Sequence, residues 1–315
     1  MANKLDKYVL SIALVTLLLG SYLTAVSASP PTGEGSPENK YALLCASTTF
    51  LYLLDYPESA RHTCIKCYGP LPYADQEVYE VRDILVDDYG WLEDHFTILI
   101  NEDNTKARVM QEIESLKQYD SPDSLFLIVL CGHGWVVEDE DGDEAAYPNI
   151  GNRQGNDPFD ECWQPYDGIP GGQGDAANMV DFIIDDEFKL LFDSLEFQGK
   201  LVVQFFSCCG SGLIEDIAGP NRLALGCGDG DKLEMHWWMV HGYNWLALSG
   251  CTGVEFPEID LDMNPDSNGD GKISVEESYY WAVAANEATD PNVVGWGGGP
   301  VGLYMVDGIE GETFL

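Results

Sequence analysis

The sequence predicts an α/β fold in which helices flank a mostly parallel β-sheet. Short apolar runs of strand length recur along the chain, and the segments between them carry apolar residues at helical spacing. The strand-type runs are 41–45, 96–100, 125–131, 201–206 and 245–248. The helical stripes are Val78, Val81, Ile84 and Leu85; Val109, Ile113 and Leu116; and Phe188, Leu191, Phe192 and Leu195. Because strand and helix alternate, we expect layers built around a parallel sheet.

The N-terminal segment predicts export. Residues 1–28 carry two lysines, then an apolar run, then small residues at alternate positions, which is typical of a cleaved signal peptide. The alternative is an uncleaved membrane anchor, since the run is just long enough to span a bilayer. Both interpretations predict a secreted or extracytoplasmic protein, with a membrane as partner only if the segment stays uncleaved. Residues 29–39 are rich in Pro, Gly and Ser and are expected to form a flexible linker.

The composition predicts a globular, strongly acidic protein. The 315 residues are 45% hydrophobic, enough for a substantial core, and 54 Asp and Glu against 15 Lys and Arg give a formal net charge of −39. Such a charge excludes nucleic acid as a partner. Solubility in a saline habitat explains most of the charge, so only acidic clusters with a defined spacing carry further information.

Nine cysteines occur in the exported part of the chain. Export permits disulfides. Cys45, Cys131 and Cys208 lie in apolar runs and are expected to be buried thiols. Cys64 and Cys67 lack a second ligand pair at zinc spacing, so a local disulfide is the preferred interpretation there.

Two buried strands break into glycine next to a chemically active side chain. The run 125–131 ends at Gly132-His133-Gly134, and the run 201–206 ends before Cys208-Cys209-Gly210. Functional sites of α/β sheets lie at such strand ends, and glycine lets backbones approach closely. An imidazole beside a thiol can take its proton and later return it to a leaving amine. We therefore expect His133 and Cys209 to form a catalytic pair; taken singly, each is more often a structural residue.

These motifs resemble those of the caspase-like cysteine peptidases, most closely the metacaspases, with legumain-type peptidases a looser match. Metacaspases carry Ser-Gly-His-Gly, which aligns with residues 131–134, and Asp-Ser-Cys-His-Ser-Gly, which aligns without a gap with residues 207–212. This register selects Cys209 as the nucleophile rather than Cys208. Strand alternation agrees with this choice: if Cys209 faces the cleft, Cys208 points to the opposite side and fills a small core position. The resemblance covers about residues 41 to 216.

The resemblance implies a caspase-like three-layer fold and hydrolysis of peptide bonds through a thioester. The backbone N–H groups of Gly134 and Cys209 would hold the oxyanion. The substrate pocket would include Glu77, Cys131 and Ser207. Ser207 stands where metacaspases have an acid that binds a basic substrate side chain, so this chain departs from the family pattern there. Glu77 could restore a preference for Arg or Lys; its alternative is a solvated carboxylate.

The resemblance also implies an activating calcium site. In calcium-dependent metacaspases the metal is held by four aspartates whose counterparts here are Asp160, Asp185, Asp186 and Asp216. Carboxylates gathered at one point repel each other until a divalent cation joins them. The alternatives are a solvated acidic surface and a helix cap at Asp185 or Asp186. The cluster 138–144 lacks a closing glutamate and is interpreted as a solvated loop.

Residues 266–277 match the twelve-residue EF-hand loop. Its expected Ca²⁺ ligands are Asp266, Asn268, Asp270, Lys272 through its carbonyl, Ser274 and Glu277. Gly271 permits the sharp turn, and Ile273 anchors the loop. A helix is expected from near Val275, with Tyr280, Val283 and Ala284 on its packing face. We expect this site to be structural.

The sequence thus predicts a peptidase domain at 40–260, followed at 261–315 by the calcium loop, its helix and a tail that pack on the domain. The predicted function is a secreted, calcium-dependent cysteine endopeptidase acting on peptides or proteins. One alternative is a transpeptidase that passes the thioester to an amine. Another is a calcium-stabilised surface or adhesion module whose catalytic pair is vestigial.

Overall fold

The computed structural model describes residues 35–51, 70–138, 159–169, 180–227, 245, 247–248, 264–289 and 303–315. They all belong to one unit of the chain, Pro31–Leu315. The predicted signal peptide, the Cys64 and Cys67 segment, residues 139–144 of the acidic cluster and the predicted boundary at 260 lie outside the described residues.

The described elements alternate between strand and helix through most of the chain. In order they are η1 (Pro37–Asn39), β1 (Lys40–Ala46), α4 (Ala74–Asp87), η2 (Glu93–His95), β2 (Phe96–Ile100), η3 (Asn101–Asp103), α5 (Lys106–Leu116), η4 (Lys117–Tyr119), β3 (Leu125–Cys131), β4 (His133–Glu138), β5 (Phe159–Gln164), β6 (Ile183–Ile184), α6 (Asp185–Leu195), β7 (Lys200–Phe206), α7 (Gly210–Glu215), β8 (Arg222–Cys227), α9 (Val275–Thr289) and β9 (Leu303–Asp307). Strands β2 and β3 coincide with the predicted runs.

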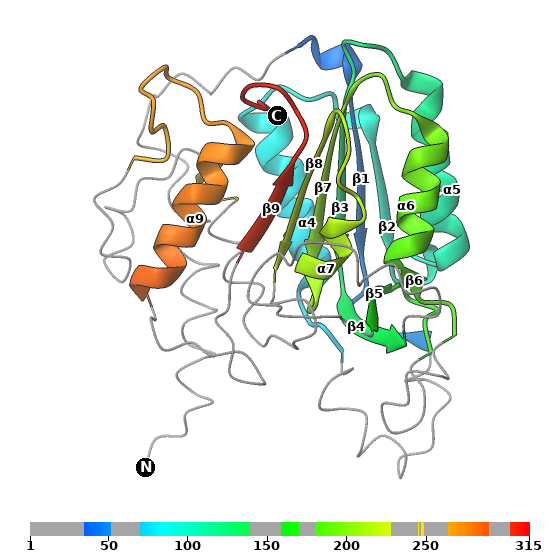
Figure 1. Ribbon diagram of the computed structural model, residues 1–315. Coiled ribbons are helices and arrows are strands. Elements are labelled where there is room, and N and C mark those ends of the chain that lie inside the picture. The colour runs from blue at the N-terminus through cyan, green and yellow to red at the C-terminus, as the bar shows by residue number, and fades with distance from the viewer. Residues whose placement is uncertain are drawn as a thin grey trace, which may run out of the picture. The chain divides into compact units, whose positions relative to one another are not determined.

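A six-stranded sheet forms the centre of the fold. Its strand order is β2-β1-β3-β7-β8-β9, and all neighbours are parallel except β9, which runs antiparallel to β8. Helices cover both faces (Figure 1). The protein therefore has the predicted α/β fold with a mostly parallel, helix-flanked sheet. The parallel strands all present their carboxyl ends at one edge, where the predicted catalytic motifs begin.

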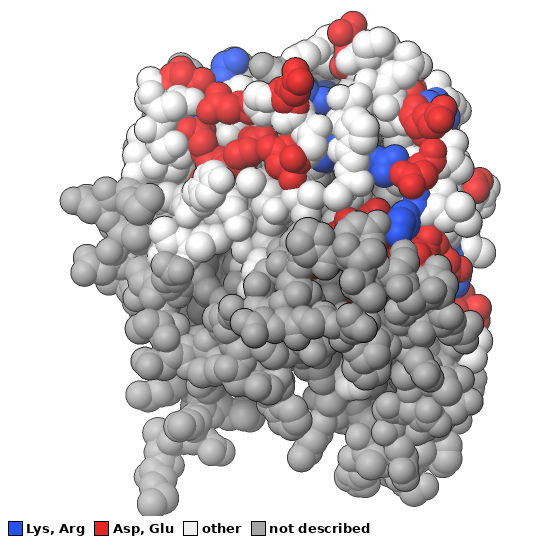
Figure 2. Space-filling view, viewed as in Figure 1, with Lys and Arg blue, Asp and Glu red and all other residues white. Residues whose placement is uncertain are grey.

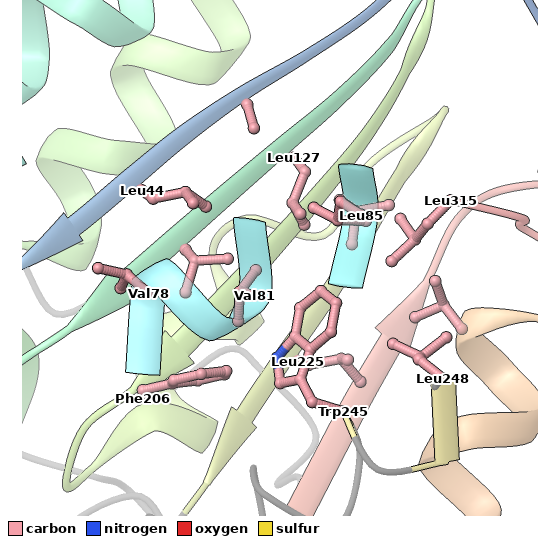
Figure 3. Packing of buried hydrophobic residues seen from close by; sticks show 14 of the residues in the cluster. Leu44, Val78, Val81, Leu85, Leu127, Phe206, Leu225, Trp245, Leu248 and Leu315 are labelled. Carbon is pink, nitrogen blue, oxygen red and sulfur yellow. The ribbon is translucent and has the colours of Figure 1, made fainter. Parts of the chain in front are cut away.

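Each face of this sheet has its own apolar core. On one face, the α4 residues Val78, Val81 and Leu85 pack on strand residues such as Leu127 and Leu225 (Figure 3). On the other face, the stripes of α5 and α6 pack on the alternate strand residues. The buried residues of α5 are Val109, Ile113 and Leu116, as the helical spacing predicted. Burial on both faces explains why the strands read as continuous apolar runs.

In the large sheet, two strands were missed and one predicted strand is wrong. Trp245, Ala247 and Leu248 are buried but have helical backbone, so the predicted strand at 245–248 is wrong. An apolar run of four residues carries too little periodicity to separate helix from strand. The fifth parallel strand is β8 instead, and β9 pairs with it in register from Leu223↔Asp307 to Cys227↔Leu303.

The long segment after His133 contains a second, antiparallel sheet. Its strand order is β4-β5-β6, with His133 opposite Gln164 and Cys162 opposite Ile184. None of its three strands was among the strands predicted from the sequence. Figure 1 shows the small sheet and α7 at the carboxyl-end edge of the large sheet. Strand β4 follows β3 after one residue, so the small sheet is attached directly to the predicted histidine motif.

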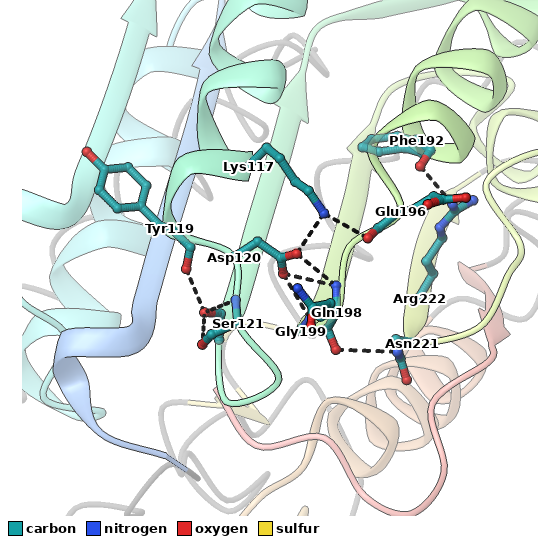
Figure 4. A network of polar contacts seen from close by, with 11 residues as sticks. Lys117, Tyr119, Asp120, Ser121, Phe192, Glu196, Gln198, Gly199, Asn221 and Arg222 are labelled. Carbon is teal, nitrogen blue, oxygen red and sulfur yellow. Dashed lines mark hydrogen bonds and ion pairs between the residues drawn. The ribbon is translucent and has the colours of Figure 1, made fainter.

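A polar network ties together the loops that precede β3 and β7 at the opposite edge (Figure 4). The Asp120 carboxylate accepts hydrogen bonds from the backbone N–H groups of Gln198 and Gly199, and it pairs with the Lys117 ammonium at 2.8 Å. Burial would raise the pKa of Asp120, but the Lys117 ammonium and the two N–H groups hold it below its ordinary value. Lys117 also donates to the carbonyl of Glu196. These contacts fix the amino ends of the two strands that carry the candidate site.

Helix α9 begins at Val275, as predicted, but its packing face matches the predicted one only in part: Val283 packs on the core, whereas Tyr280 does not. The exposed residue Tyr280 is 63% accessible, whereas Trp281, Ala282 and Ala285 are buried. Most of the first ten residues of this helix are apolar or aromatic, and they occupy every face of the helix. Their spacing therefore could not show which face packs. The backbone N–H of Val275 donates to the carbonyl oxygen of Thr313, and the backbone N–H of Thr313 donates to the side-chain carboxylate of Glu276. These two bonds join the helix to the C-terminal tail.

The described surface carries many acidic and few basic side chains (Figure 2). Among the residues that the structure describes, no helix is both long and apolar enough to cross a membrane.

Candidate functional site

The ends of β3 and β7 bring the histidine and cysteine motifs together. These strands are parallel neighbours, with Cys131 paired to Phe206, and Gly132 N donates to Phe206 O at 3.1 Å. His133 follows two residues after Cys131, and Cys209 follows three residues after Phe206. The two motifs therefore leave the sheet from adjacent positions at the same edge.

Glycines allow the two motifs to touch through their backbones. A Cβ atom at Gly134 would overlap the carbonyl oxygen of Cys208. A Cβ atom at Gly210 would lie 2.8 Å from the carbonyl oxygen of Cys227 at the end of β8. Any larger residue would push these segments apart. The glycines of the two motifs thus allow close backbone contact between the motifs, and between the cysteine motif and the end of β8.

His133 is the first residue of β4 and is buried, with 8% of its surface exposed. The Phe50 ring packs against the imidazole at a centroid distance of 5.2 Å. Phe50 lies in the segment after β1 and is itself fully buried. It restricts where the imidazole can turn. Sequence reasoning missed Phe50, since a single phenylalanine after a strand has no distinguishing pattern.

Cys209 lies in a turn rather than on a strand. Its backbone is left-handed, with φ 56° and ψ 17°, and α7 begins at the next residue. Because β7 ends at Phe206, strand alternation does not extend to the cysteines and cannot decide which way Cys208 and Cys209 point. Both belong to the apolar cluster on the α4 face, and Cys209 is only 1% exposed. A non-glycine residue in this conformation is strained, which is common at functional turns.

Two of the three predicted pocket residues are in direct contact. The Cys131 thiol donates a hydrogen bond to Glu77, with 3.4 Å between Sγ and Oε2. Burial raises the pKa of the half-buried Glu77 to about 7, although the bond from Cys131 opposes this shift. Burial and the Glu77 charge raise the pKa of Cys131, which disfavours its thiolate form.

Ser207, the third pocket residue, lies beside the histidine motif. Its hydroxyl is fully buried without a hydrogen-bond partner, and a Cβ atom at Gly134 would lie 3.2 Å from it. Its carbonyl oxygen accepts from the Cys227 thiol at 2.9 Å. Ser207 therefore lies between the histidine motif and the end of β8. Its neutral hydroxyl stands at the position where metacaspases have an acid.

Side chains of strand β5 pack against glycines of both motifs. A Cβ atom at Gly132 would lie 2.9 Å from Trp163 Nε1, and a Cβ atom at Gly212 would overlap the carboxylate of Glu161. Trp163 and Glu161 are fully buried. Sequence reasoning assigned neither residue to the site, because the alternation within 159–164 has no clear apolar face.

The four aspartates predicted to hold an activating calcium lie on separate elements. Asp160 is on β5, Asp185 and Asp186 begin α6, and Asp216 follows α7. Asp185 accepts backbone hydrogen bonds from Glu161 N at 2.8 Å and Asp186 N at 3.0 Å. Asp216 pairs with the Lys189 ammonium at 3.0 Å. Asp160, Asp185 and Asp216 are buried, which excludes the solvated acidic surface for these three.

The predicted EF-hand loop is closed by its own carboxylates. Asp266 accepts backbone hydrogen bonds from Gly269, Asp270 and Gly271, and Gly271 has φ +86°. Glu277 accepts from the backbone N–H of Ser267 and Asn268 and exchanges hydrogen bonds with Ser274 as a capping box at the start of α9.

These donors and turns are those that an EF-hand loop uses. Both carboxylates face the interior of the loop, where the cation of such a loop is held. Across the described ranges, however, no group of three or more His, Cys, Asp or Glu side chains is arranged to hold a metal ion.

Comparisons with known proteins leave the family open. No protein-family model and no curated protein matches the chain. Among solved structures, the chain is similar to the crystal structure of protein GSU0716 from Geobacter sulfurreducens, with 14% sequence identity and a TM-score of 0.45. The match covers 85% of this chain and 93% of that chain. A likeness this low carries no argument about activity.

Proposed function

We propose that this protein is an exported cysteine endopeptidase of the caspase-like fold that uses His133 and Cys209. The observation that carries the proposal is the meeting of the two motifs, where β3 and β7 end side by side and Gly134 lies against the Cys208 carbonyl. A strand-end histidine and a strand-end cysteine are common separately. Their convergence at the carboxyl edge of one parallel sheet is what a catalytic pair requires.

In the proposed reaction, the His133 imidazole takes the thiol proton of Cys209 and the thiolate attacks the substrate carbonyl. The C–N bond breaks, His133 returns the proton to the leaving amine, and a thioester remains on Cys209. Water then attacks the thioester and releases the carboxylic acid and the thiol. Backbone N–H groups of Gly134 and Cys209 are proposed to stabilise the oxyanion in both steps.

Calcium dependence is part of the proposal. The metal would be held by the loop at 266–277 for stability and by Asp160, Asp185, Asp186 and Asp216 for activation. Bound calcium would supply positive charge that offsets repulsion between carboxylates. In the described arrangement Asp216 already pairs with Lys189.

One observation favours a second function. His133 and Cys209 are 8% and 1% exposed, so a peptide cannot reach them unless neighbouring groups move. A calcium-stabilised surface or adhesion module with a vestigial pair would have no need of access. A transpeptidase would share the chemistry of the endopeptidase and differ only in the acceptor.

The deciding experiment is labelling with an electrophilic active-site probe, followed by a peptide-library cleavage profile in calcium. A peptidase labels at Cys209 and cleaves peptides. A transpeptidase labels and joins added amines to the substrate. In an adhesion module, Cys209 of the folded protein labels no faster than Cys209 of the denatured protein. That result would contradict the proposal that the protein is an enzyme.

A further inference from the structure

Strand β5 turns one row of side chains toward both halves of the candidate site. Alternate residues of a strand point to the same face, so Glu161 and Trp163 share one face and Asp160 and Cys162 the other. The first row meets Gly132, just before His133, and Gly212, three residues after Cys209.

Glu161 approaches the nucleophile turn very closely. Its side chain is fully buried, and its carboxylate rests on Gly212 so tightly that a Cβ atom there would overlap it. Gly212 N donates to the carbonyl oxygen of Cys209 at 3.2 Å. A displacement at Gly212 therefore passes directly to the backbone of Cys209.

The same strand is anchored to the histidine side of the site. In the small sheet, Glu161 lies opposite Val136, and His133 lies opposite Gln164. The backbone N–H of Glu161 donates to Asp185 at 2.8 Å, which fixes the strand to the start of α6. One strand thus holds the histidine through pairing and the cysteine turn through a side chain.

We propose that Glu161 is a positioning residue that sets the location of Cys209 relative to His133 by packing on Gly212. This role rests on the proposed function and assigns Glu161 no contact with substrate. The size of the side chain is what matters, because the contact is made against a glycine with no room for a methyl group.

A double-mutant cycle tests the contact. Gly212→Ala should slow alkylation of Cys209 by iodoacetamide by about tenfold, because the new methyl group displaces the turn. Glu161→Ala should slow it similarly, because the turn loses its support. The double variant should react within about threefold of the parent, since the methyl group then occupies the vacated space. The rate at Cys209 is read by peptide mass spectrometry, well below the melting temperature of each variant.

Three further variants separate positioning from general stability. Cys162→Ala removes a buried side chain from the other face of β5, so it should lower the melting temperature without changing the alkylation rate. Gly134→Ala meets a backbone carbonyl, so Glu161→Ala should not rescue it. Glu161→Gln keeps the size of the side chain and should retain the parent rate, which also covers the case that Glu161→Ala fails to fold.

The outcomes separate this proposal from the proposed function. Fast, Glu161-dependent alkylation without peptide hydrolysis would overturn the peptidase and leave the positioning role standing. Additive losses in the cycle, or a parent rate in Gly212→Ala, would overturn the positioning role whatever the peptidase assay shows. A parent whose Cys209 reacts no faster than Cys208 would contradict both.

Discussion

The Cys131 thiol, two residues before His133, donates a hydrogen bond to the Glu77 carboxylate, with 3.4 Å between Sγ and Oε2. Because burial raises the pKa of Glu77 to about 7, this carboxylate changes charge within the physiological range. Specificity and stability should both respond to that change.

Specificity should depend on pH through Glu77. Above pH 7 the ionised carboxylate attracts a basic substrate side chain, and below it the neutral acid does not. We expect the ratio of kcat/KM for Arg over Gln at the cleavage position to fall as pH falls from about 8 to 6. Glu77→Gln should give a low, flat ratio. A ratio that stays high in Glu77→Gln would place the determinant elsewhere.

Stability should respond with the opposite sign. The folded-state pKa of Glu77 is raised from 4.5 to about 7, so the folded protein holds a proton that the unfolded chain has lost between these values. Glu77 therefore favours folding at low pH and loses this contribution as pH rises to about 7. The melting temperature of the parent minus that of Glu77→Gln should decrease over this range. An unchanged difference would show that Glu77 is solvated.

The register of the cysteine motif is testable by substitution. Cys209→Ala should reduce peptidase activity by about a thousandfold or more, and Cys208→Ala should retain it within about an order of magnitude. His133→Ala should be as damaging as Cys209→Ala, and the double variant should be no worse than either, because the two residues act as one unit. Loss of activity in Cys208→Ala with retention in Cys209→Ala would reverse the register.

The EF-hand loop should bind calcium with a measurable effect on stability. Calcium at about a hundredfold over its Kd should add about 2.7 kcal/mol and raise the melting temperature. Glu277→Gln should remove most of this rise. It should also lower the calcium-free value slightly, because Glu277 caps α9 through Ser274. Glu276→Gln, which alters the bond to Thr313, should lower both values equally. Equal rises in the parent and Glu277→Gln would exclude calcium from the loop.

The activating calcium site should reside in the aspartates at the start of α6. Replacing Asp185 and Asp186 together with Asn keeps their size, and the calcium concentration for half-maximal peptidase activity should rise by at least about tenfold. Glu187→Gln at the next position is the control, since this carboxylate binds Lys106. Full activity of the parent in excess chelator would contradict the site.

Asp120 should contribute to stability at neutral pH. Asp120→Ala leaves the N–H groups of Gln198 and Gly199 without their acceptor and should cost about 2 kcal/mol in denaturant unfolding. Because its pKa is lowered from 3.8, the contribution is present above that value and is lost as pH falls below it. The exposed Asp123 offers a control, since Asp123→Ala should change little. An equal effect from both would assign the network no special role.

Most of the central sheet could be predicted from the sequence, because strands that are buried on both faces form recognisable apolar runs. The predicted strands at 96–100 and 125–131 begin at Phe96 and Leu125, as observed. The apolar stripe predicted for α5 is the face that is buried. Strand β8 was missed because Arg222 and Gly226 interrupt its apolar character. Strand β9 lies far along the chain from its partner, and pairing between such segments leaves no local signal.

The candidate site was predictable only where a motif marks it. His133 and Cys209 are flagged by glycine after an apolar strand. Phe50, Trp163 and Glu161 come from segments without a clear period, and they reach the site through tertiary contact. The packing face of α9 was also not predictable, because apolar residues occupy every face of its first half and their spacing does not show which face packs.

The pairing of β8 with β9 has a consequence for biosynthesis. Residues 228–302 separate these partners, and β9 completes the large sheet at its β8 edge. While the ribosome is still making that intervening stretch, the outer edge of β8 has unpaired backbone groups that can pair with other chains. Closing so large a loop is also slow. The nascent protein should therefore depend on late closure by β9, and until β9 has been made and has paired, its greatest hazard is association through β8.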